Sequence, residues 1–169
     1  RIDQIAKDSL LDLVRAANLE KARDAMFAGQ PINTTEDRRV LHVALRDRSN
    51  TADQSVAQEV AKVMERLATY TNSVRDGRAI GITGRPFSNI ISIGIGGSHL
   101  GPLLVAEALA SKPLLTLHFV ANLDGHDLET ALAKSNPETT LILIASKSFA
   151  TEETLTNAGS AITWLTNAL

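Results

Sequence analysis

The sequence contains no cysteine, which excludes disulfide bridges, a thiolate nucleophile and a metal site with cysteine ligands. Long apolar runs are also missing. The longest strongly apolar stretch covers only 141–145, whereas a membrane span needs about 18 residues. Neither sign of charge dominates, because 17 Lys and Arg residues stand against 19 Asp and Glu residues, for a net charge of −2. We therefore expect neither nucleic acid nor a membrane as a partner.

The two ends of the chain lack the usual boundary signals. The chain begins at Arg1 with no apolar signal segment, and residues 164–169 have a helical pattern without a cap or a glycine. These features predict a piece of a longer protein. With 169 residues, 44% of them hydrophobic and 21% charged, the chain has the composition of a globular domain, or of one domain with an appendage.

The first part of the chain, 1–87, has the spacing of helices. Apolar residues recur at helical intervals within 5–14 and again from Ser55 onward, where Gly77 is a typical helix stop. Between these segments, Asn33 and Glu36 fit a capping box, which predicts a helix that runs on through 40–45. We therefore expect residues 1–87 to form an N-terminal helical segment.

The second part, 88–169, alternates strands with helices. Three short apolar segments at 88–95, 115–121 and 139–145 predict strands, and 102–111, 127–134 and 152–169 have a helical pattern, with Pro102 in a first turn. The strands are too apolar to have one face in water, so we expect a parallel sheet covered by helices on both sides. The fold class is α/β, and this second domain is the first part of a larger one.

A glycine-rich loop follows the first predicted strand. Gly94, Gly96 and Gly97 would let backbone N–H groups approach an anion at a helix start, and Ser98 adds a hydroxyl. The dinucleotide fingerprint fails because His99 occupies its third glycine position, and the Walker motif fails because no lysine follows the last glycine. A tight strand-to-helix turn without a ligand remains an alternative.

A hydroxyl-rich loop follows the third predicted strand. Its four hydroxyls belong to Ser146, Ser148, Thr151 and Thr154, and it opens a helix. Helix capping needs only one hydroxyl, so the pattern favours a phosphate cradle over capping by Ser148 or Thr151. Carboxylates at 152 and 153 suit the helix dipole but would repel a phosphate if they pointed toward it.

Several segments together resemble the glucose-6-phosphate isomerase (phosphoglucose isomerase) family. They are Ile93-Gly94-Ile95-Gly96-Gly97-Ser98 with Leu100-Gly101-Pro102, Val40-Leu41-His42-Val43-Ala44-Leu45-Arg46, Asn136-Pro137-Glu138-Thr139-Thr140-Leu141, and Ala145-Ser146-Lys147-Ser148-Phe149. They occur in the family's order and extend over nearly the whole chain. The resemblance implies a sugar isomerase (SIS) fold with a three-layer parallel sheet. It also implies a cytoplasmic enzyme of glycolysis and gluconeogenesis, a homodimer in its full length, that interconverts glucose 6-phosphate and fructose 6-phosphate without a metal or cofactor.

The resemblance also implies a set of substrate-binding residues. They are Gly97, Ser98, Ser146, Lys147 through its backbone, Ser148, Thr151 and Thr154. The chain departs from the family pattern at His99, Ala150 and Glu152, where the family usually has Asp, Thr and Gln, and at Ser148, which keeps the hydroxyl of the usual Thr.

The catalytic groups that the resemblance implies lie beyond Leu169. They are a Glu base, His and Lys for ring opening, and an Arg that stabilises negative charge. We therefore expect this piece alone to be inactive, with no catalytic residue of its own. A non-catalytic phosphosugar-binding SIS module is the alternative. The helical segment 1–87, with its own family-like motif around His42, favours the enzyme.

One phosphosugar can touch both loops only if the first and third strands are neighbours. The second strand must then lie on the other side of the first, which predicts the strand order 2-1-3.

Overall fold

The structure is a computed structural model that describes residues 2–47, 54–110 and 114–169. The chain divides into two compact units, 1–68 and 69–169, and helix α3 (Gln54–Arg75) begins in the first and ends in the second. No helix in the described ranges is long and apolar enough to cross a membrane.

The first unit contains α1 (Gln4–Ala16), α2 (Leu19–Phe27), the short 3-10 helix η1 (Ala44–Arg46) and the start of α3. The Asp3 side chain caps α1 by accepting a 2.8 Å hydrogen bond from Ala6 N–H. Ala44 is the single buried residue among those described in this unit. The two expected helices at 5–14 and from Ser55 are present, and the second ends before Gly77, whose φ is +70°.

The prediction of a helix after Asn33 is wrong. Asn33 and Arg38 instead form an antiparallel bridge around a turn in which Asp37 is left-handed, with φ +49°. Within that turn the Asn33 side chain donates to Glu36 at 3.0 Å and accepts from Thr35 at 2.8 Å. The Asn33 and Glu36 side chains thus bond to other side chains and not to the backbone N–H groups that a capping box would satisfy, and the local sequence closes a turn and not a helix. Only η1 forms in the apolar stretch that follows.

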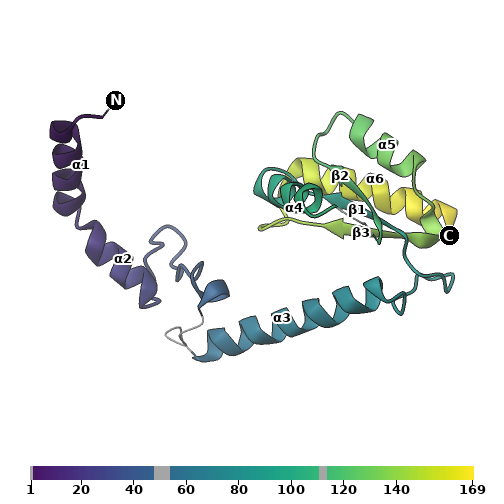
Figure 1. The fold of residues 1–169 in the computed structure, drawn as a ribbon, viewed down its shortest axis with the longest axis horizontal. Coiled ribbons are helices and arrows are strands. Elements are labelled where there is room, and N and C mark those ends of the chain that lie inside the picture. Colours follow the sequence, from purple (N-terminus) through teal and green to yellow (C-terminus); the bar gives the residue numbers. More distant parts are fainter. Residues whose placement is uncertain (1, 48–53, 111–113) are drawn as a thin grey trace. The chain divides into compact units, whose positions relative to one another are not determined.

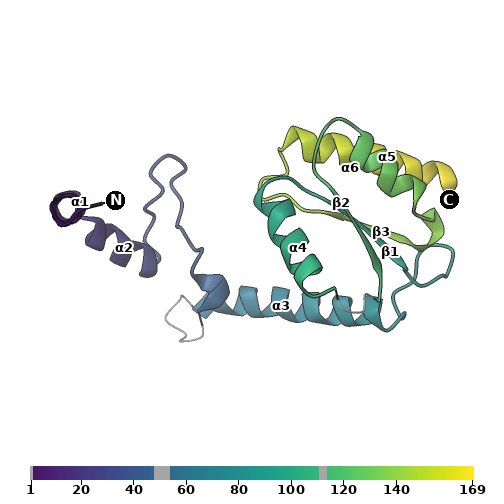
Figure 2. The same cartoon turned by 45° about the horizontal axis from the view of Figure 1, so that its top comes forward.

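The second unit is built on a parallel sheet of β1 (Asn89–Ile93), β2 (Thr116–Val120) and β3 (Thr140–Ile144) in the order β2-β1-β3. Ile91 is aligned with His118 on one side and with Ile142 on the other. Figures 1 and 2 show α4 (Gly97–Ala108) on one face of the sheet and α5 (His126–Ala133) and α6 (Glu152–Ala168) on the other. The 3-10 helix η2 (Pro137–Thr139) leads into β3. The predicted α/β class and strand order are confirmed.

The core lies on the α5 and α6 face of the sheet. Its buried residues come from the sheet and from the two helices on this side: Ile91, Ile93, Val120, Leu128, Ala131, Ala158 and Ala161. The α4 face is covered less completely, since the strand residues Leu117 and Leu143 on that face are 43% and 42% exposed. The β-branched strand residues therefore pack mainly against the small alanines of α5 and α6, which allow the helices to approach the sheet closely.

Helix α4 begins earlier than its sequence predicts. It starts at Gly97, with only three residues between it and the end of β1, because Gly96 takes a φ of +57° and its carbonyl accepts the first helical bond from Leu100 N–H at 2.8 Å. Pro102 consequently lies inside the helix and not in its first turn, and it cannot donate to the Ser98 carbonyl one turn earlier. Ser111, the expected last residue, lies outside the described residues.

Candidate functional site

The two predicted binding loops meet at the carboxyl ends of β1 and β3. These strands are paired side by side, and Ala145 N–H donates to the Ile93 carbonyl at 2.8 Å where they end. Gly94 lies at the point of closest approach. A Cβ at this position would be 3.0 Å from both Cβ and the carbonyl oxygen of Ser98, and 3.1 Å from the Ala145 carbonyl oxygen. The absence of a side chain at Gly94 therefore lets the glycine loop rest against the residue that precedes Ser146.

The glycine loop leaves open space beside its backbone. Gly96 and Gly97 are exposed, and a Cβ at either would meet no atom within 4 Å. Ser98 is half-buried, and its N–H donates to the Ile95 carbonyl at 3.1 Å, which closes the first turn of α4. In the described part of the chain, the Gly97 N–H makes no hydrogen bond. The start of α4 thus offers a backbone donor, a positive helix end and room for a ligand.

The hydroxyl loop is organised by its own side chains. Ser146 Oγ accepts from Phe149 N–H at 3.0 Å and lies 3.5 Å from Thr151 Oγ1, and Ser148 Oγ accepts from Ala150 N–H at 3.3 Å. Phe149 is left-handed, with φ +51°. The Thr151 side chain does not cap α6, and the Ser148 hydroxyl bonds outside the helix. The capping alternative is therefore not what the structure shows, and the hydroxyls instead hold a tight turn ahead of the helix.

Thr154 lies apart from the other predicted binding residues. It is 2% exposed, on the face of α6 that packs on the sheet, and its Oγ1 has no hydrogen-bond partner in the described ranges. Asn157, one turn further on, is also buried and donates to the Asn122 carbonyl at 2.8 Å. The structure thus brings Gly97, Ser98, Ser146, Lys147, Ser148 and Thr151 to one edge of the sheet, with the Thr154 hydroxyl enclosed behind them.

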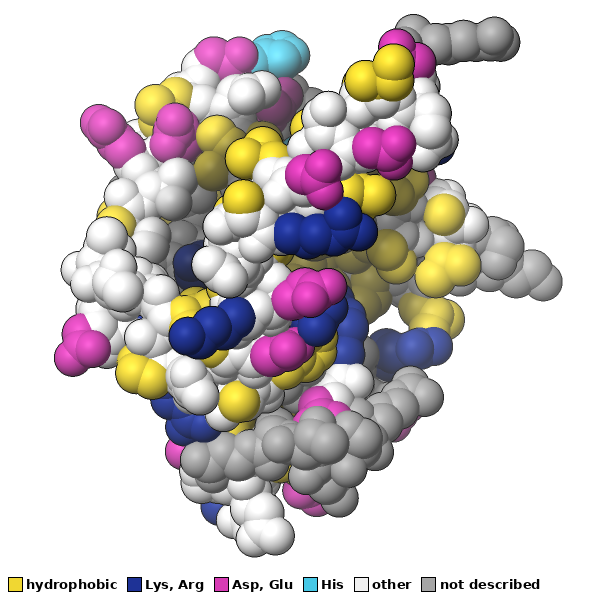
Figure 3. Space-filling model, turned by 90° about the vertical axis from the view of Figure 1, so that its left-hand side faces the viewer, with side chains coloured by type: hydrophobic (Ala, Val, Ile, Leu, Met, Phe, Trp, Pro, Cys, Tyr) yellow, Lys and Arg dark blue, Asp and Glu magenta, His cyan; other side chains and the backbone are white. Residues whose placement is uncertain are grey.

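The charges around the two loops are unpaired. Lys147 and Glu152 are exposed and Glu153 is half-buried, and none of them forms an ion pair among the residues that the structure describes. On the face of the molecule shown in Figure 3, basic and acidic side chains are intermingled and not gathered by sign. No group of histidine and acidic residues in the described ranges could hold a metal ion.

His99 holds the glycine loop against the neighbouring strand. Its ring meets the ring of Phe119 in β2 edge-on, with centroids 6.0 Å apart and an angle of 77° between the planes. Its Nδ1 is buried and has no partner in the described ranges. The spacing of the two residues in the sequence carries no signal of this contact, because it arises from the packing of α4 against β2.

His118 lies on the face of the sheet that packs against α5 and α6, and its surroundings disfavour its protonated form. Burial, with a smaller contribution from the Lys134 cation, lowers the pKa of His118 below its ordinary value. Its Nε2 is buried without a partner in the described part of the chain. The folded state therefore favours the neutral imidazole.

We expect acidification to destabilise the fold through His118. In the unfolded chain this histidine titrates near 6.5. Its stabilising contribution is complete above that pH and is lost as the pH falls from there through the lower folded pKa. Between pH 7.5 and pH 5.5, the urea midpoint of His118→Gln should fall less than the midpoint of the unchanged chain. His42 is exposed, and the midpoint of His42→Gln should fall as much as that of the unchanged chain. Equal losses in all three would contradict this assignment.

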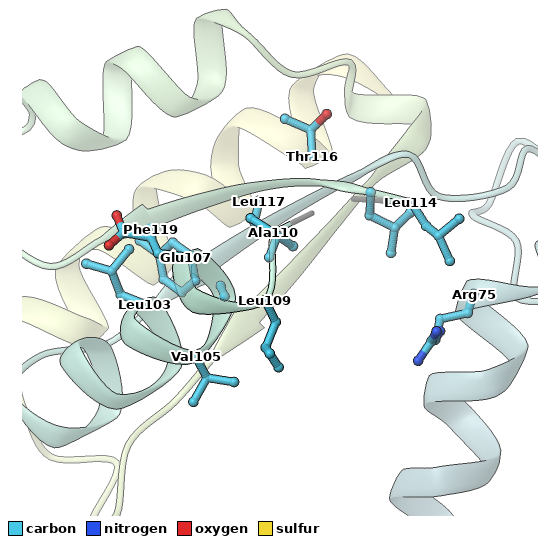
Figure 4. A pocket seen from close by; sticks show the side chains of 12 residues that line it. Arg75, Leu103, Val105, Glu107, Leu109, Ala110, Leu114, Thr116, Leu117 and Phe119 are labelled. Carbon is cyan, nitrogen blue, oxygen red and sulfur yellow. The ribbon is translucent and has the colours of Figure 1, made fainter. Parts of the chain in front are cut away.

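A separate apolar groove lies between α4 and β2 (Figure 4). Its volume is about 610 Å³, and its walls include Leu103, Val105, Leu109, Leu117 and Phe119, with Arg75 and Glu107 at its margins. A second groove of about 450 Å³ runs along β2 between His99, His118 and His126. Neither is lined by any of the predicted binding residues, so neither groove belongs to the loop site.

Comparison with known proteins finds both a matching family model and similar solved structures. The family model of phosphoglucose isomerase matches residues 1–169. Among solved structures, a glucose-6-phosphate isomerase from Chlamydia trachomatis D/UW-3/Cx is similar, with a TM-score of 0.74 and 28% sequence identity. The match covers 99% of this chain and 33% of that one, so the chain spans about a third of the length of that enzyme.

Proposed function

Since the chain belongs to the phosphoglucose isomerase family, we propose that it is part of an enzyme that interconverts glucose 6-phosphate and fructose 6-phosphate. Its own role in that enzyme is to hold the sugar phosphate. The full-length protein acts as a cytoplasmic homodimer of glycolysis and gluconeogenesis, and needs no metal or cofactor.

The observation that carries this proposal is the contact between the two loops at Gly94. This contact, between Gly94 and both Ser98 and the Ala145 carbonyl, supports a single site that combines the backbone donor of Gly97 and the Ser98 hydroxyl with the loop of Ser146 to Thr151. Phosphate oxygens accept hydrogen bonds, and both loops open helices whose N-terminal ends favour anions. In this arrangement the hydroxyls of Ser148 and Thr151 and the N–H of Lys147 bind the phosphate, and Gly97 and Ser98 contact the sugar.

The same loops lack the groups that isomerisation requires. Moving a proton between two sugar carbons needs a base beside them, and opening the ring needs an acid. Among the ionisable side chains at this edge, Lys147, Glu152 and Glu153 lie at the proposed phosphate end of the substrate, and the His99 ring packs against Phe119. We therefore expect the 169-residue chain to bind the phosphosugar without converting it. A coupled assay of purified chain should stay at background, and turnover that survives repurification would contradict this.

Calorimetric titration tests the binding. We expect glucose 6-phosphate to bind and glucose not to bind, because the phosphate carries the recognition. Ser148→Ala should weaken glucose 6-phosphate binding about tenfold, the usual effect of losing a hydrogen bond to a charged group. Ser160→Ala, an exposed serine on α6, is the matched control and should leave the affinity unchanged. Equal responses to glucose and its phosphate, or no binding of either, would overturn the proposal.

A further inference from the structure

The first turn of α6 places two carboxylates directly after the hydroxyl loop. Glu152 and Glu153 are the first two residues of the helix, and neither makes an ion pair in the described ranges. The single cation within 146–154 is Lys147, so this segment has a formal charge of −1. A loop built to hold a doubly charged phosphate would gain from a positive charge here, and this chain has the opposite.

The two carboxylates differ in their surroundings. The buried residues of α6, which include Thr154, Asn157 and Ala158, define the face that packs on the sheet. Glu152 lies about 200° around the helix from Thr154, on the solvent side, and is exposed, whereas Glu153 is half-buried. A helical side chain also tilts toward the N-terminus of its helix, which directs the Glu152 side chain toward the loop.

The position of Glu152 makes its charge effective at the loop. It belongs to the first helical turn, where charges interact most strongly with the helix end and with anything bound there. A phosphate held by Ser148 and Thr151 would lie within one Debye length of it, about 8 Å at physiological salt. The Glu152 carboxylate and the ligand would then compete for the same positive end of α6.

From this arrangement we infer that Glu152 limits the affinity of the hydroxyl loop for doubly charged phosphate esters. The inference rests on the proposed phosphate site and concerns how strongly that site binds. Glu152 acts through its charge at a distance and is not itself a ligand of the phosphate. A neutral residue of the same shape at this position would give a tighter site.

Titration of the chain with glucose 6-phosphate at low salt tests the inference. We expect Glu152→Gln to bind about two- to fivefold more tightly than the unchanged chain. Glu129→Gln, an exposed glutamate in the first turn of α5, is the matched control and should leave the affinity unchanged.

Salt dependence separates a charge effect from a structural one. Because ions screen the repulsion, the advantage of Glu152→Gln should shrink as sodium chloride is raised from about 20 to about 500 mM. Binding that is unchanged or weaker in Glu152→Gln, or an advantage that does not depend on salt, would overturn the inference while leaving the phosphate site in place. No binding by either protein would overturn the proposed function, and this inference with it.

Discussion

Ile93→Ala is expected to lower the free energy of unfolding of the α/β unit by about 2–5 kcal/mol, the usual range for removing a large aliphatic side chain from a core. Ile93 is the last residue of β1 and has no exposed surface. It belongs to the cluster in which the central strand packs against α5 and α6, so the cavity would open in the core at the carboxyl end of that strand.

Urea unfolding followed by circular dichroism would measure this loss. Ile82→Ala is the matched control, because that isoleucine is 85% exposed and its truncation should change the midpoint little. If the two variants lost similar stability, the core would not be centred on the face of β1 that we describe.

Gly94→Ala is expected to cost about 1–3 kcal/mol and to abolish detectable phosphosugar binding. The new methyl group would come within 3.0–3.1 Å of two backbone carbonyl oxygens and of Ser98 Cβ, and backbone atoms cannot rotate away as a flexible side chain can. Relief requires the glycine loop and the strand end at Ala145 to separate, which pulls apart the two halves of the proposed site.

The matched control for Gly94→Ala is the same substitution at Gly159. This glycine lies in α6, where a Cβ would meet nothing within 4 Å, so alanine there should stabilise the chain by about 0.5–1 kcal/mol. Thermal melts and calorimetric titration of both variants would test the pair. A Gly94→Ala chain that keeps its melting temperature and its binding would show that the two loops are not in contact.

The local sequence predicts the strands and their order, but it does not predict where α4 begins or that Asn33 lies in a turn. The three strands are predicted from short apolar runs such as 141–145, although Leu143 within that run is 42% exposed on the less covered face of the sheet. The order β2-β1-β3 follows from the requirement that one ligand touch both loops. The start of α4 is missed because Pro102 is typical of the first turn of a helix. In the structure Gly96 bends the chain, and the helix begins at Gly97, five residues before that proline. The Asn33 turn is missed because the same residue types, Asn and Glu at this spacing, favour both turns and helix caps.

The remaining differences come from tertiary packing. Nothing near Thr154 in the sequence says that its hydroxyl faces the sheet, since this depends on which side of α6 is buried. The contact between His99 and Phe119 likewise requires that β2 lie beside β1. Residue type and spacing identify the hydroxyl and glycine loops, but the packing of the layers decides which of their side chains can reach a ligand.

The pairing of β1 with β3 has a consequence for the order of assembly. β2 joins β1 after a single crossover, whereas β3 joins only after two, so the contact that completes the loop site has the higher contact order. The proposed site therefore cannot form before β3 joins the sheet. A ligand that holds both loops would stabilise the β1–β3 pairing by mass action. Its clearest reporter is the amide proton of Ala145, which bonds to the Ile93 carbonyl across the two strands and would exchange with solvent more slowly when the site is filled.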